Sequence, residues 1–406
     1  MSKQTTYADA GIHNEVKESV SKILYEASRE TWKNRKGKLG EIIVPFDDFS
    51  GIRYISLSNI PKGVVMGEGA DGEGTKPEFS ERTGDFTKDA YNLFAMFLDD
   101  VLVRGGEPVL VTTVLDVNSL KNPDGTERIS QIRQLAEGYV KAAERGDVCV
   151  ISGENAELST RVGGYSKLPN FFTRARQGLE YVISGKKISD SDFHFNWSGT
   201  CTWFANEKRL FTGREIKKGD SLVGLADPGF GSNGISLVRK IGEKYFGREW
   251  HLEKYKLESG ETETLGKLVL TPCKIYSRAV VDMYGGYEQE ARTEVHGVAH
   301  ITGGGLPEKI KRVLKPSGLG ANINNPIKPP EIMIYFQRVG NVSDEEAYNT
   351  WHMGQRLVIV TPKPDKVMQI ASEYRIDSQK IGEVTEKKGI RIKNKGAFSK
   401  GEFLDF

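Results

Sequence analysis

The stretch over residues 63–79, GVVMGEGADGEGTKPEF, limits the possible folds of this chain more than any other part of the sequence. The short apolar run at its start predicts a buried strand, and the glycines that follow predict a loop. These glycines are Gly67, Gly69, Gly72 and Gly74. Glycine lets the backbone turn freely and lets a ligand approach the amides closely, which matters most for a phosphate chain. We therefore expect a binding loop at the end of a strand.

Two charged side chains indicate what this loop binds. An aspartate would repel phosphate unless a cation lay between them, so Asp71 predicts Mg²⁺, and Lys76 predicts a direct phosphate contact. The glycine spacing also fits the dinucleotide-binding pattern, but Pro77 and Glu78 follow where that pattern needs a helix. Thr75 and Lys76 stand in the reverse order to the end of a P-loop. A glycine-rich hairpin turn without a ligand is the alternative.

Length and composition indicate a soluble protein with two domains. The 406 residues, 38% of them hydrophobic, are enough for a large core and favour two domains over one. The 57 basic and 55 acidic residues nearly cancel, which argues against nucleic-acid and membrane-surface partners and favours a small molecule. Three widely spaced cysteines fit a reducing compartment. With no membrane-spanning run and no signal-peptide pattern, we expect a cytoplasmic protein.

An acidic pair follows in the next helical segment. The apolar periodicity predicts a helix over residues 89–103, with Asp99 and Asp100 near its C-terminal end. The helix dipole disfavours acids at that end, so a nearby metal explains the pair. A solvated helix end is the alternative.

A second acidic loop follows a second strand. The strand is predicted over residues 148–151, and the loop after it contains Glu154 and Asn155. In layered α/β structures, ligands collect beyond such strand ends. We therefore expect Glu154 and Asn155 to join Asp71 and Asp100 around one cation.

The remaining pattern of the first half predicts further helices and strands. Helices are expected over 14–31 and 129–145, a flexible basic stretch over 33–38, and strands over 41–44, 53–57, 109–114, 179–184 and 199–204. A polar segment at 213–219 precedes a new strand at 221–226. We therefore predict an N-terminal domain over 1–215 and a C-terminal domain over 216–406.

Two glycine loops in the second half each lead into a helix. Residues 227–234 precede a helix over 235–245, and residues 302–305 precede one over 306–314. A helix N-terminus has free N–H groups and a dipole that favour an anion, so Ser232 and Asn233 predict a phosphate site. The other predicted elements are helices over 273–283, 344–351 and 366–374, strands over 295–301, 332–336 and 357–361, a final strand pair, and a solvated basic tail over 387–400.

These loops together resemble a known family, the phosphoribosylformylglycinamidine cyclo-ligases, also called aminoimidazole ribonucleotide synthetases. The family's opening Tyr-x-Asp-Ala-Gly is similar to residues 7–11, and its Asp-Gly-x-Gly-Thr-Lys loop to residues 71–76. Further similar motifs lie at residues 95–108, 153–157, 219–240, 299–305 and 352–354. They stand in the family's order over nearly the whole chain, except residues 33–59 and 161–196.

The resemblance implies an α+β fold with two domains. The N-terminal domain carries a β-sheet that pairs with its twin in a homodimer, the C-terminal domain is an α/β sandwich, and ATP binds between them. The implied reaction closes the imidazole ring of formylglycinamidine ribonucleotide, with ATP activating the formyl oxygen, and yields aminoimidazole ribonucleotide, ADP and phosphate.

The resemblance also implies roles for particular residues. Asp71, Asp100 and Asp99 would hold Mg²⁺, and Lys76, Asp71 and Asn233 would act in catalysis. The residues implied to bind ATP or substrate phosphates are Gly72, Gly74, Thr75, Lys76, Glu154, Asn155, Ser232, Gly234, Gly303, Gly304 and Gly305.

The chain departs from the family pattern near the expected substrate. Gly231 stands where the family usually has a histidine before Ser-Asn-Gly, and no neighbour in the sequence replaces that imidazole. Asn155 replaces a threonine, and Asp99 replaces an asparagine. An ATP-dependent enzyme of the same superfamily with another small acceptor is therefore the alternative function. A dimeric nucleotide-binding protein without turnover is a third.

Overall fold

The computed structural model describes residues 13–45, 53–122, 124–165 and 192–406. The motif at 7–11 and the strand predicted at 179–184 lie outside these residues. The N-terminal part contains α1 (Asn14–Thr31), the 3₁₀-helix η2 (Trp32–Arg35), β1 (Val64–Gly72), α2 (Pro77–Thr83), α3 (Asp89–Leu102), β2 (Glu107–Val117), α4 (Ile129–Gly146), β3 (Cys149–Glu157), η3 (Ser159–Arg161), β4 (Phe195–Asn206) and η4 (Glu207–Arg209).

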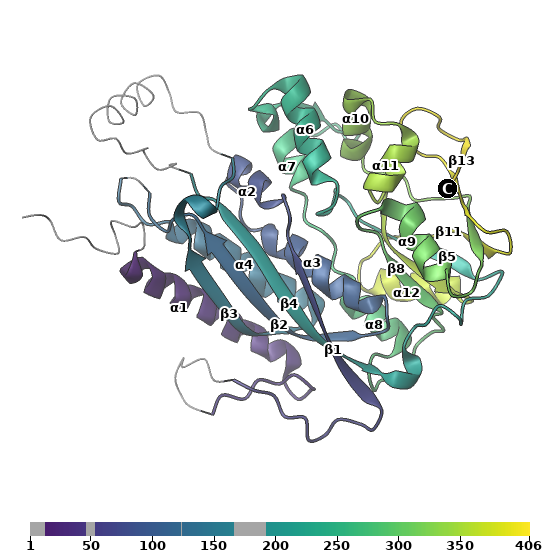
Figure 1. Cartoon of the computed structure of the whole chain (residues 1–406), viewed down its shortest axis with the longest axis horizontal. Coiled ribbons are helices and arrows are strands. Elements are labelled where there is room, and N and C mark those ends of the chain that lie inside the picture. The colour runs from purple at the N-terminus through teal and green to yellow at the C-terminus, as the bar shows by residue number, and fades with distance from the viewer. Residues whose placement is uncertain (1–12, 46–52, 123, 166–191) are drawn as a thin grey trace, which may run out of the picture.

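The N-terminal strands form a four-stranded sheet in the order β1-β4-β2-β3. Strand β4 is antiparallel to β1 and β2, whereas β2 and β3 run parallel. Helices α1, α3 and α4 pack on one face of this sheet, where their apolar sides form a common core with β2, β3 and β4 (Figure 1). The predicted helices at 14–31, 89–103 and 129–145 are confirmed to within one residue at each end.

Strand β1 is longer than the sequence predicted. It includes Gly67 and Gly69, which were expected in the loop, and ends at Gly72. A Cβ atom at Gly67 would lie 2.2 Å from Cζ2 of Trp203 on β4, so this glycine makes room for an indole ring across the strand pair. The expected binding loop therefore begins only at Glu73.

A helix follows this loop, although Pro77 and Glu78 were expected to exclude one. Helix α2 starts at Pro77, which stands in its first turn. Proline suits that position because its missing N–H has no partner there and its φ angle is already helical. Pro77 therefore starts a helix instead of excluding one.

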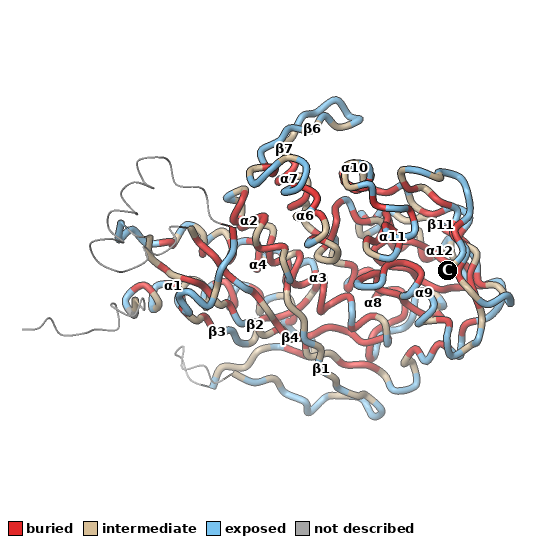
Figure 2. The backbone as a smooth tube through the Cα atoms, turned by 45° about the horizontal axis from the view of Figure 1, so that its top comes forward, coloured by how far each residue is buried: buried red, intermediate tan, exposed pale blue. Residues whose placement is uncertain are grey.

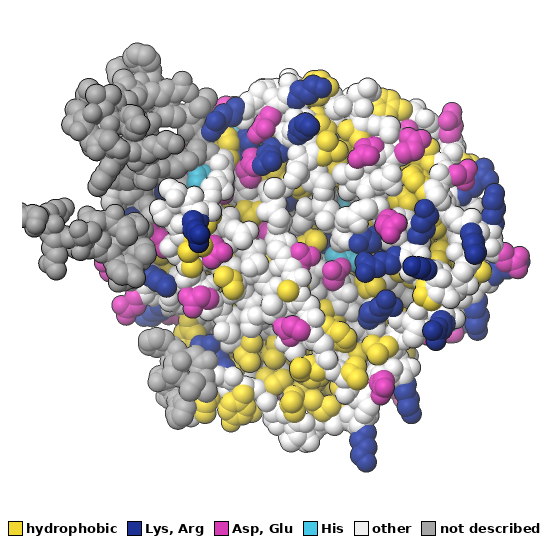
Figure 3. Space-filling model, viewed as in Figure 1, with side chains coloured by type: hydrophobic (Ala, Val, Ile, Leu, Met, Phe, Trp, Pro, Cys, Tyr) yellow, Lys and Arg dark blue, Asp and Glu magenta, His cyan; other side chains and the backbone are white. Residues whose placement is uncertain are grey.

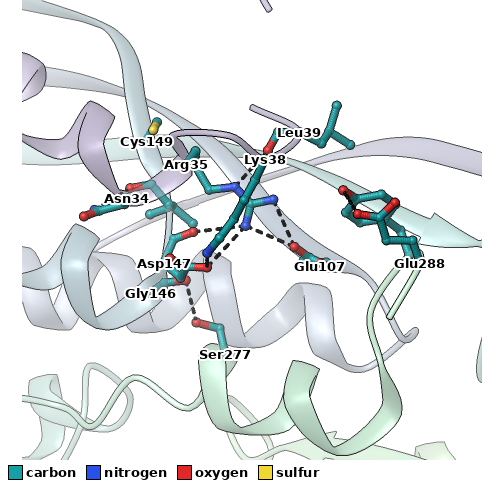
Figure 4. A network of polar contacts seen from close by, with 12 residues as sticks. Asn34, Arg35, Lys38, Leu39, Glu107, Gly146, Asp147, Cys149, Ser277 and Glu288 are labelled. Atoms are coloured by element: carbon teal, nitrogen blue, oxygen red, sulfur yellow. Dashed lines mark hydrogen bonds and ion pairs between the residues drawn. The ribbon is translucent and has the colours of Figure 1, made fainter. Parts of the chain in front are cut away.

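The stretch at 33–38, predicted to be flexible, is anchored by a buried arginine. Arg35 is 1% exposed, and Nη1 and Nη2 both lie 3.0 Å from Oε1 of Glu107 on β2. Nη1 also reaches Oδ2 of Asp147 at 3.4 Å, and Lys38 reaches the same atom at 2.8 Å (Figure 4). The strands predicted at 41–44 and 53–57 are wrong, since only one bridge, between Ile43 and Tyr54, forms there.

The C-terminal part contains a seven-stranded sheet in the order β13-β12-β9-β11-β5-β10-β8. Its elements are β5 (Ser221–Ala226), α6 (Ile235–Phe246), η5 (Trp250–Leu252), β6 (Lys254–Lys256), β7 (Thr262–Thr264), α7 (Leu265–Val269), α8 (Ser277–Tyr284), β8 (Gly297–His300), α9 (Gly305–Leu314), β9 (Gly320–Ile323), α10 (Glu331–Gly340), α11 (Asp344–Thr350), β10 (Gln355–Thr361), α12 (Pro364–Glu373), β11 (Ser378–Thr385), β12 (Ile390–Lys393) and β13 (Phe403–Asp405).

Helices cover both faces of this sheet, as expected for an α/β sandwich. Residues of α6, α9, α10 and α11 form a core on one face, and residues of α8 and α12 form a core on the other. The central strands β5 and β10 are almost completely buried. In Figure 2 the interior of the C-terminal half is correspondingly mostly red. Such two-sided burial explains the continuous apolar runs of β5 and β10.

Two predictions for this half are wrong. Residues 332–336 lie in helix α10 instead of a strand, because Glu331 favours the first turn and Asn341 ends the helix in the left-handed conformation. The basic segment at 387–400 is not only a solvated tail, since β12 pairs with β9 and β13 and Ile392 is fully buried. The net charge of this segment concealed its apolar alternation.

Helix α3 joins the two sheets. It packs on β1, β2 and β4 and also contacts α8 and β8 of the C-terminal part, so it lies between the two halves in Figure 1. The sheets separate between β4 and β5, and the boundary after residue 215 stays a prediction. All three cysteines are free and buried. Among the described residues, no helix is both long and apolar enough to cross a membrane.

Candidate functional site at the domain interface

The loop after β1 lies against the C-terminal half. The backbone N–H of Glu73 donates to the carbonyl of Trp197, which fixes the start of the loop to β4. At its end, Oγ1 of Thr75 lies 3.1 Å from Oγ of Ser236 on α6. Gly74 has a φ of +71°, in the left-handed region that favours glycine. The loop therefore bridges the two halves of the molecule.

Lys76 is buried beneath this loop. Its Nζ donates to the carbonyl oxygen of Gly231 at 3.0 Å, and its side chain is completely shielded from solvent. Burial lowers the pKa of Lys76, while the charges of Asp227 and Glu73 oppose that shift. Its contact in this structure ties the loop after β1 to the loop before α6, and its predicted phosphate contact stays a prediction.

Asp71 and Asp100 are the acidic residues that come together near this loop. Asp71, at the end of β1, is half-buried, and its Oδ1 accepts from the N–H of Gly72 at 2.7 Å. Burial raises the pKa of Asp71, and the negative charge of Asp100 raises it further. Two carboxylates that repel each other at a partly open position form an arrangement that a cation would stabilise.

His300 and Arg356 support Asp100 from the C-terminal half. Nδ1 of His300 lies 2.7 Å from Oδ1 of Asp100, and Nε2 lies 3.1 Å from Nη2 of Arg356. Burial would raise the pKa of Asp100, but the hydrogen bond from His300 and the positive charges of Lys309 and Arg356 together lower it. Burial lowers the pKa of His300 to about 4, so this imidazole is neutral at pH 7.

Asp99 faces away from Asp100 and into the protein. Its Oδ1 accepts from the N–H of Tyr276 at 3.0 Å, and its Oδ2 lies 3.3 Å from Nη1 of Arg356. Burial raises the pKa of Asp99 to about 7, against the effect of Arg356. Because both oxygens are engaged and the side chain is fully buried, we withdraw Asp99 as a metal ligand. The alternative prediction, a solvated helix end, is also wrong for Asp99, because its side chain is fully buried.

The two predicted glycine loops lie at helix N-termini in the same region. Gly234 caps α6 with a φ of +72°, and Gly304 caps α9 with a φ of +88°. A Cβ atom at Gly305 would lie 1.9 Å from the carbonyl oxygen of Tyr348, so only glycine fits there. Both helices leave free N–H groups, which attract anions. Ser232 and Asn233 precede Gly234, and Gly303 precedes Gly304.

Glu154 and Asn155 lie elsewhere. Both are in β3, at the opposite edge of the sheet from β1, so the expected joint site with Asp71 is wrong within one chain. Glu154 is exposed, and Asn155 is buried with its Nδ2 donating to Ser21 on α1 at 3.0 Å. Order along the chain could not show that two other strands separate β3 from β1.

A buried acidic pair lies beside Lys76. Glu73 and Asp89 are both fully buried; Asn92 donates to Oε1 of Glu73 at 3.3 Å, and Ser80 donates to Oδ1 of Asp89 at 2.7 Å. Apart from the hydrogen bond between the two carboxyl groups, the remaining oxygen of each has no partner in the described residues. Burial raises the pKa of Asp89 to about 8 and that of Glu73 well above its usual value. The pair therefore shares a proton at neutral pH.

Sequence reasoning missed Arg356, Asp227 and the role of His300. Arg356 belongs to β10, whose seven residues are all buried, and a charged residue within such a strand was the one available signal. Asp227 lies 3.9 Å from Arg356 and accepts from the N–H of Lys274. Their partners are distant along the chain, so spacing alone could not identify them.

Two family models match the chain. They are described as AIR synthase related protein, N-terminal domain, over residues 59–171, and AIR synthase related protein, C-terminal domain, over residues 217–395. The hydrogenase maturation protein HypE of E. coli has a TM-score of 0.57 and 14% identity and covers 96% of both chains. That similarity shows a common fold.

Similar sequences extend over the full length. The phosphoribosylformylglycinamidine cyclo-ligase of Symbiobacterium thermophilum is 30% identical over 94% of this chain and 95% of its own. That of Methanococcoides burtonii is 30% identical over 97% and 98%. That of Pyrococcus furiosus is 28% identical over 96% and 98%. Both domains and nearly the whole length agree, and the chain belongs to the phosphoribosylformylglycinamidine cyclo-ligase family.

Proposed function

We propose that this chain is an ATP-dependent phosphoribosylformylglycinamidine cyclo-ligase. It converts formylglycinamidine ribonucleotide and ATP into aminoimidazole ribonucleotide, ADP and phosphate, a step of purine biosynthesis. The observation that carries this proposal is the meeting of the loop after β1, the two helix N-terminal loops and the Asp71–Asp100 pair at one domain interface. Full-length similarity to proteins of that name supports it.

The two carboxylates fit a magnesium ion. They are hard oxygen donors that repel each other, and hydrogen bonds engage only the Oδ1 atom of each. The described residues contain no group of three metal-binding side chains, so water and phosphate oxygens would complete the coordination. When bound, Mg²⁺ would neutralise charge on the ATP phosphates.

The chain's own residues would hold and orient the reactants. The N–H groups that begin α6 and α9, after Ser232, Asn233 and Gly234 and after Gly303 and Gly304, would bind phosphate oxygens. Gly72, Gly74 and Thr75 would let the ATP phosphates approach the backbone. Lys76 would fix the relative position of the two loops through the carbonyl of Gly231. Catalysis then depends on positioning the γ-phosphoryl group against the formyl oxygen.

We also propose that the chain forms a homodimer through its N-terminal sheet. Helices α1, α3 and α4 lie on one face, and the opposite face includes the exposed side chains of Met66 and Val114. Hydrophobic side chains gather in the lower part of Figure 3, where Figure 1 places β1. In such a dimer the uncovered faces of the two sheets would pack together, with the two-fold axis between them and parallel to the strands. This symmetry would place the β3 edge of one copy beside the β1 edge of the other. Glu154 and Asn155 would then approach the site of the second copy.

The test is to incubate the purified chain with Mg²⁺, ATP and formylglycinamidine ribonucleotide. We expect ADP and aminoimidazole ribonucleotide to form in equal amounts. ADP formation without ring closure, or ATP binding without any product, would contradict the proposal.

A second candidate is an enzyme of the same superfamily that activates another small acceptor. Gly231, without the usual imidazole, is the observation that favours it. Formation of ADP with another acceptor, but not with formylglycinamidine ribonucleotide, would establish it.

A further inference from the structure

Arg356 lies beside Gly231 in the loop before α6. Gly231 is buried with a φ of +70°, and a Cβ atom built there would lie 3.4 Å from Nε and 3.5 Å from Cδ of Arg356. These distances are ordinary van der Waals contacts, so the arginine side chain of β10 packs against the loop at the position where the family usually has an imidazole.

The guanidinium of Arg356 is held from several sides. Nη1 donates to the carbonyl of Lys274 at 3.0 Å and lies 3.3 Å from Oδ2 of Asp99, while Asp227 lies 3.9 Å away. The side chain is 1% exposed. These contacts fix the direction of Nη2, which points at Nε2 of His300 over 3.1 Å. Arg356 itself cannot touch a substrate in this arrangement.

This contact and the contact with Asp100, whose carboxylate only accepts, together determine the tautomer of His300. A guanidinium only donates hydrogen bonds, so Nε2 of His300 has to accept. The proton of a neutral imidazole then lies on Nδ1, where it is donated to Oδ1 of Asp100 at 2.7 Å. Asp100 is consequently held through one oxygen, while the other oxygen remains available.

We propose that Arg356 is a positioning residue that acts through His300 on Asp100. By fixing the Nδ1–H tautomer, it orients the carboxylate that, with Asp71, holds the metal. The inference rests on the proposed role of Asp100 as a metal ligand. It assigns to β10 and β8 a supporting function for a site whose carboxylates lie on β1 and α3.

The first test observes the imidazole directly. Full-length protein labelled with ¹⁵N-histidine, without metal or nucleotide, is examined by long-range ¹H–¹⁵N correlation, and His300 is assigned by the signal lost in His300→Asn. We expect the Nδ1–H tautomer in the wild type and a mixture of states in Arg356→Met. Arg356→Met alone leaves the buried carboxylate of Asp99 without its ion-pair partner, which destabilises the fold. The double variant Asp99→Asn/Arg356→Met removes both charges and avoids this effect. An unchanged tautomer in this folded double variant would overturn the inference.

The second test measures binding of Mn²⁺–ATP by electron paramagnetic resonance. Loss of a partner that orients a metal ligand weakens affinity by about 10 to 100-fold, and we expect this for Arg356→Met. The variant His300→Asn keeps an amide donor near the position of Nδ1 but cannot respond to Arg356. In this background we therefore expect Arg356→Met to cause no further loss of affinity for Mn²⁺–ATP. An equal loss in both backgrounds would show that Arg356 does not act through His300.

A matched control is Arg35→Met, which removes another buried arginine whose partners are Glu107 and Asp147. We expect its His300 tautomer and Mn²⁺–ATP affinity to equal those of the wild type. A comparable change in this variant would mean that general destabilisation explains both effects. Neither test requires turnover. Failure to form aminoimidazole ribonucleotide would therefore contradict the proposed reaction without affecting this inference.

Discussion

At the scale of single residues, Asp89 makes stability depend on pH. An unfolded aspartate releases its proton near pH 4, whereas burial raises the pKa of Asp89 to about 8. Between these values the folded chain binds more protons than the unfolded chain, so the free energy of unfolding falls as pH rises, by about 1 kcal/mol per pH unit for one group. The contribution is fully present below about pH 4 and is lost by about pH 8.

Asp89→Asn tests this expectation. The neutral amide removes the proton uptake, so the variant should lose part of the decline in stability between pH 5 and pH 8. Urea unfolding at several pH values measures it, and Asp405→Asn, in β13 at the far edge of the other sheet, is the control. The same pH dependence in wild type and Asp89→Asn would contradict a shared proton with Glu73.

Asp71→Asn tests the metal site at the same scale. Removing one of two carboxylates should weaken Mg²⁺–ATP binding by at least about tenfold, with little effect on unfolding because Asp71 lies at a strand end outside the apolar core. Isothermal titration calorimetry measures the affinity. Asp405→Asn, in β13 at the far edge of the other sheet, should bind as the wild type does. Unchanged affinity in Asp71→Asn would remove this residue from the site.

At the scale of elements, β1 depends on the contact between Gly67 and Trp203. A methyl group at position 67 would overlap the indole, so Gly67→Ala should lower the free energy of unfolding by about 1 to 3 kcal/mol. Gly69→Ala is the matched control two residues along the strand, where the nearest atom to a built Cβ is Val101 Cγ2 at 3.9 Å. Chemical denaturation should separate the two variants. Equal stabilities would show that β1 can move away from Trp203.

The elements also show where sequence reasoning failed. Apolar periodicity located α1 and α4 well because each buries one continuous side against the sheet. It located α3 because that helix is apolar along most of its length and is buried between the two halves. It failed for α10, whose Ile, Tyr and Phe residues favour strands but fit a helix packed in the core beside α6. Local preference differs little between the two structures for such a run, so tertiary packing decides.

At the scale of the whole molecule, the dimer interface can be tested by charge. Val114→Lys places a cation in the centre of the face that we propose is covered in the dimer, where its desolvation would be unfavourable. Sedimentation should show dimers for the wild type and mainly monomers for the variant. Leu252→Lys, an exposed leucine of the C-terminal half, should remain dimeric. A monomeric wild type, or a dimeric Val114→Lys, would contradict the proposed interface.

The sequence by itself determined the two-domain α+β fold, the family and the identity of most loops at the domain interface. The fold followed from glycine positions, helix starts and apolar periods, which are local properties of the chain, and the family followed from the resemblance of its loop motifs. Tertiary structure alone decided which carboxylates meet. It turned Asp99 inward to Arg356, placed Asp100 beside Asp71, and left Glu154 across the sheet. The buried partners Arg356 and His300 come from strands far from α3 in sequence. Their pairing with its acids follows from burial, because a buried charge without a partner is strongly destabilising.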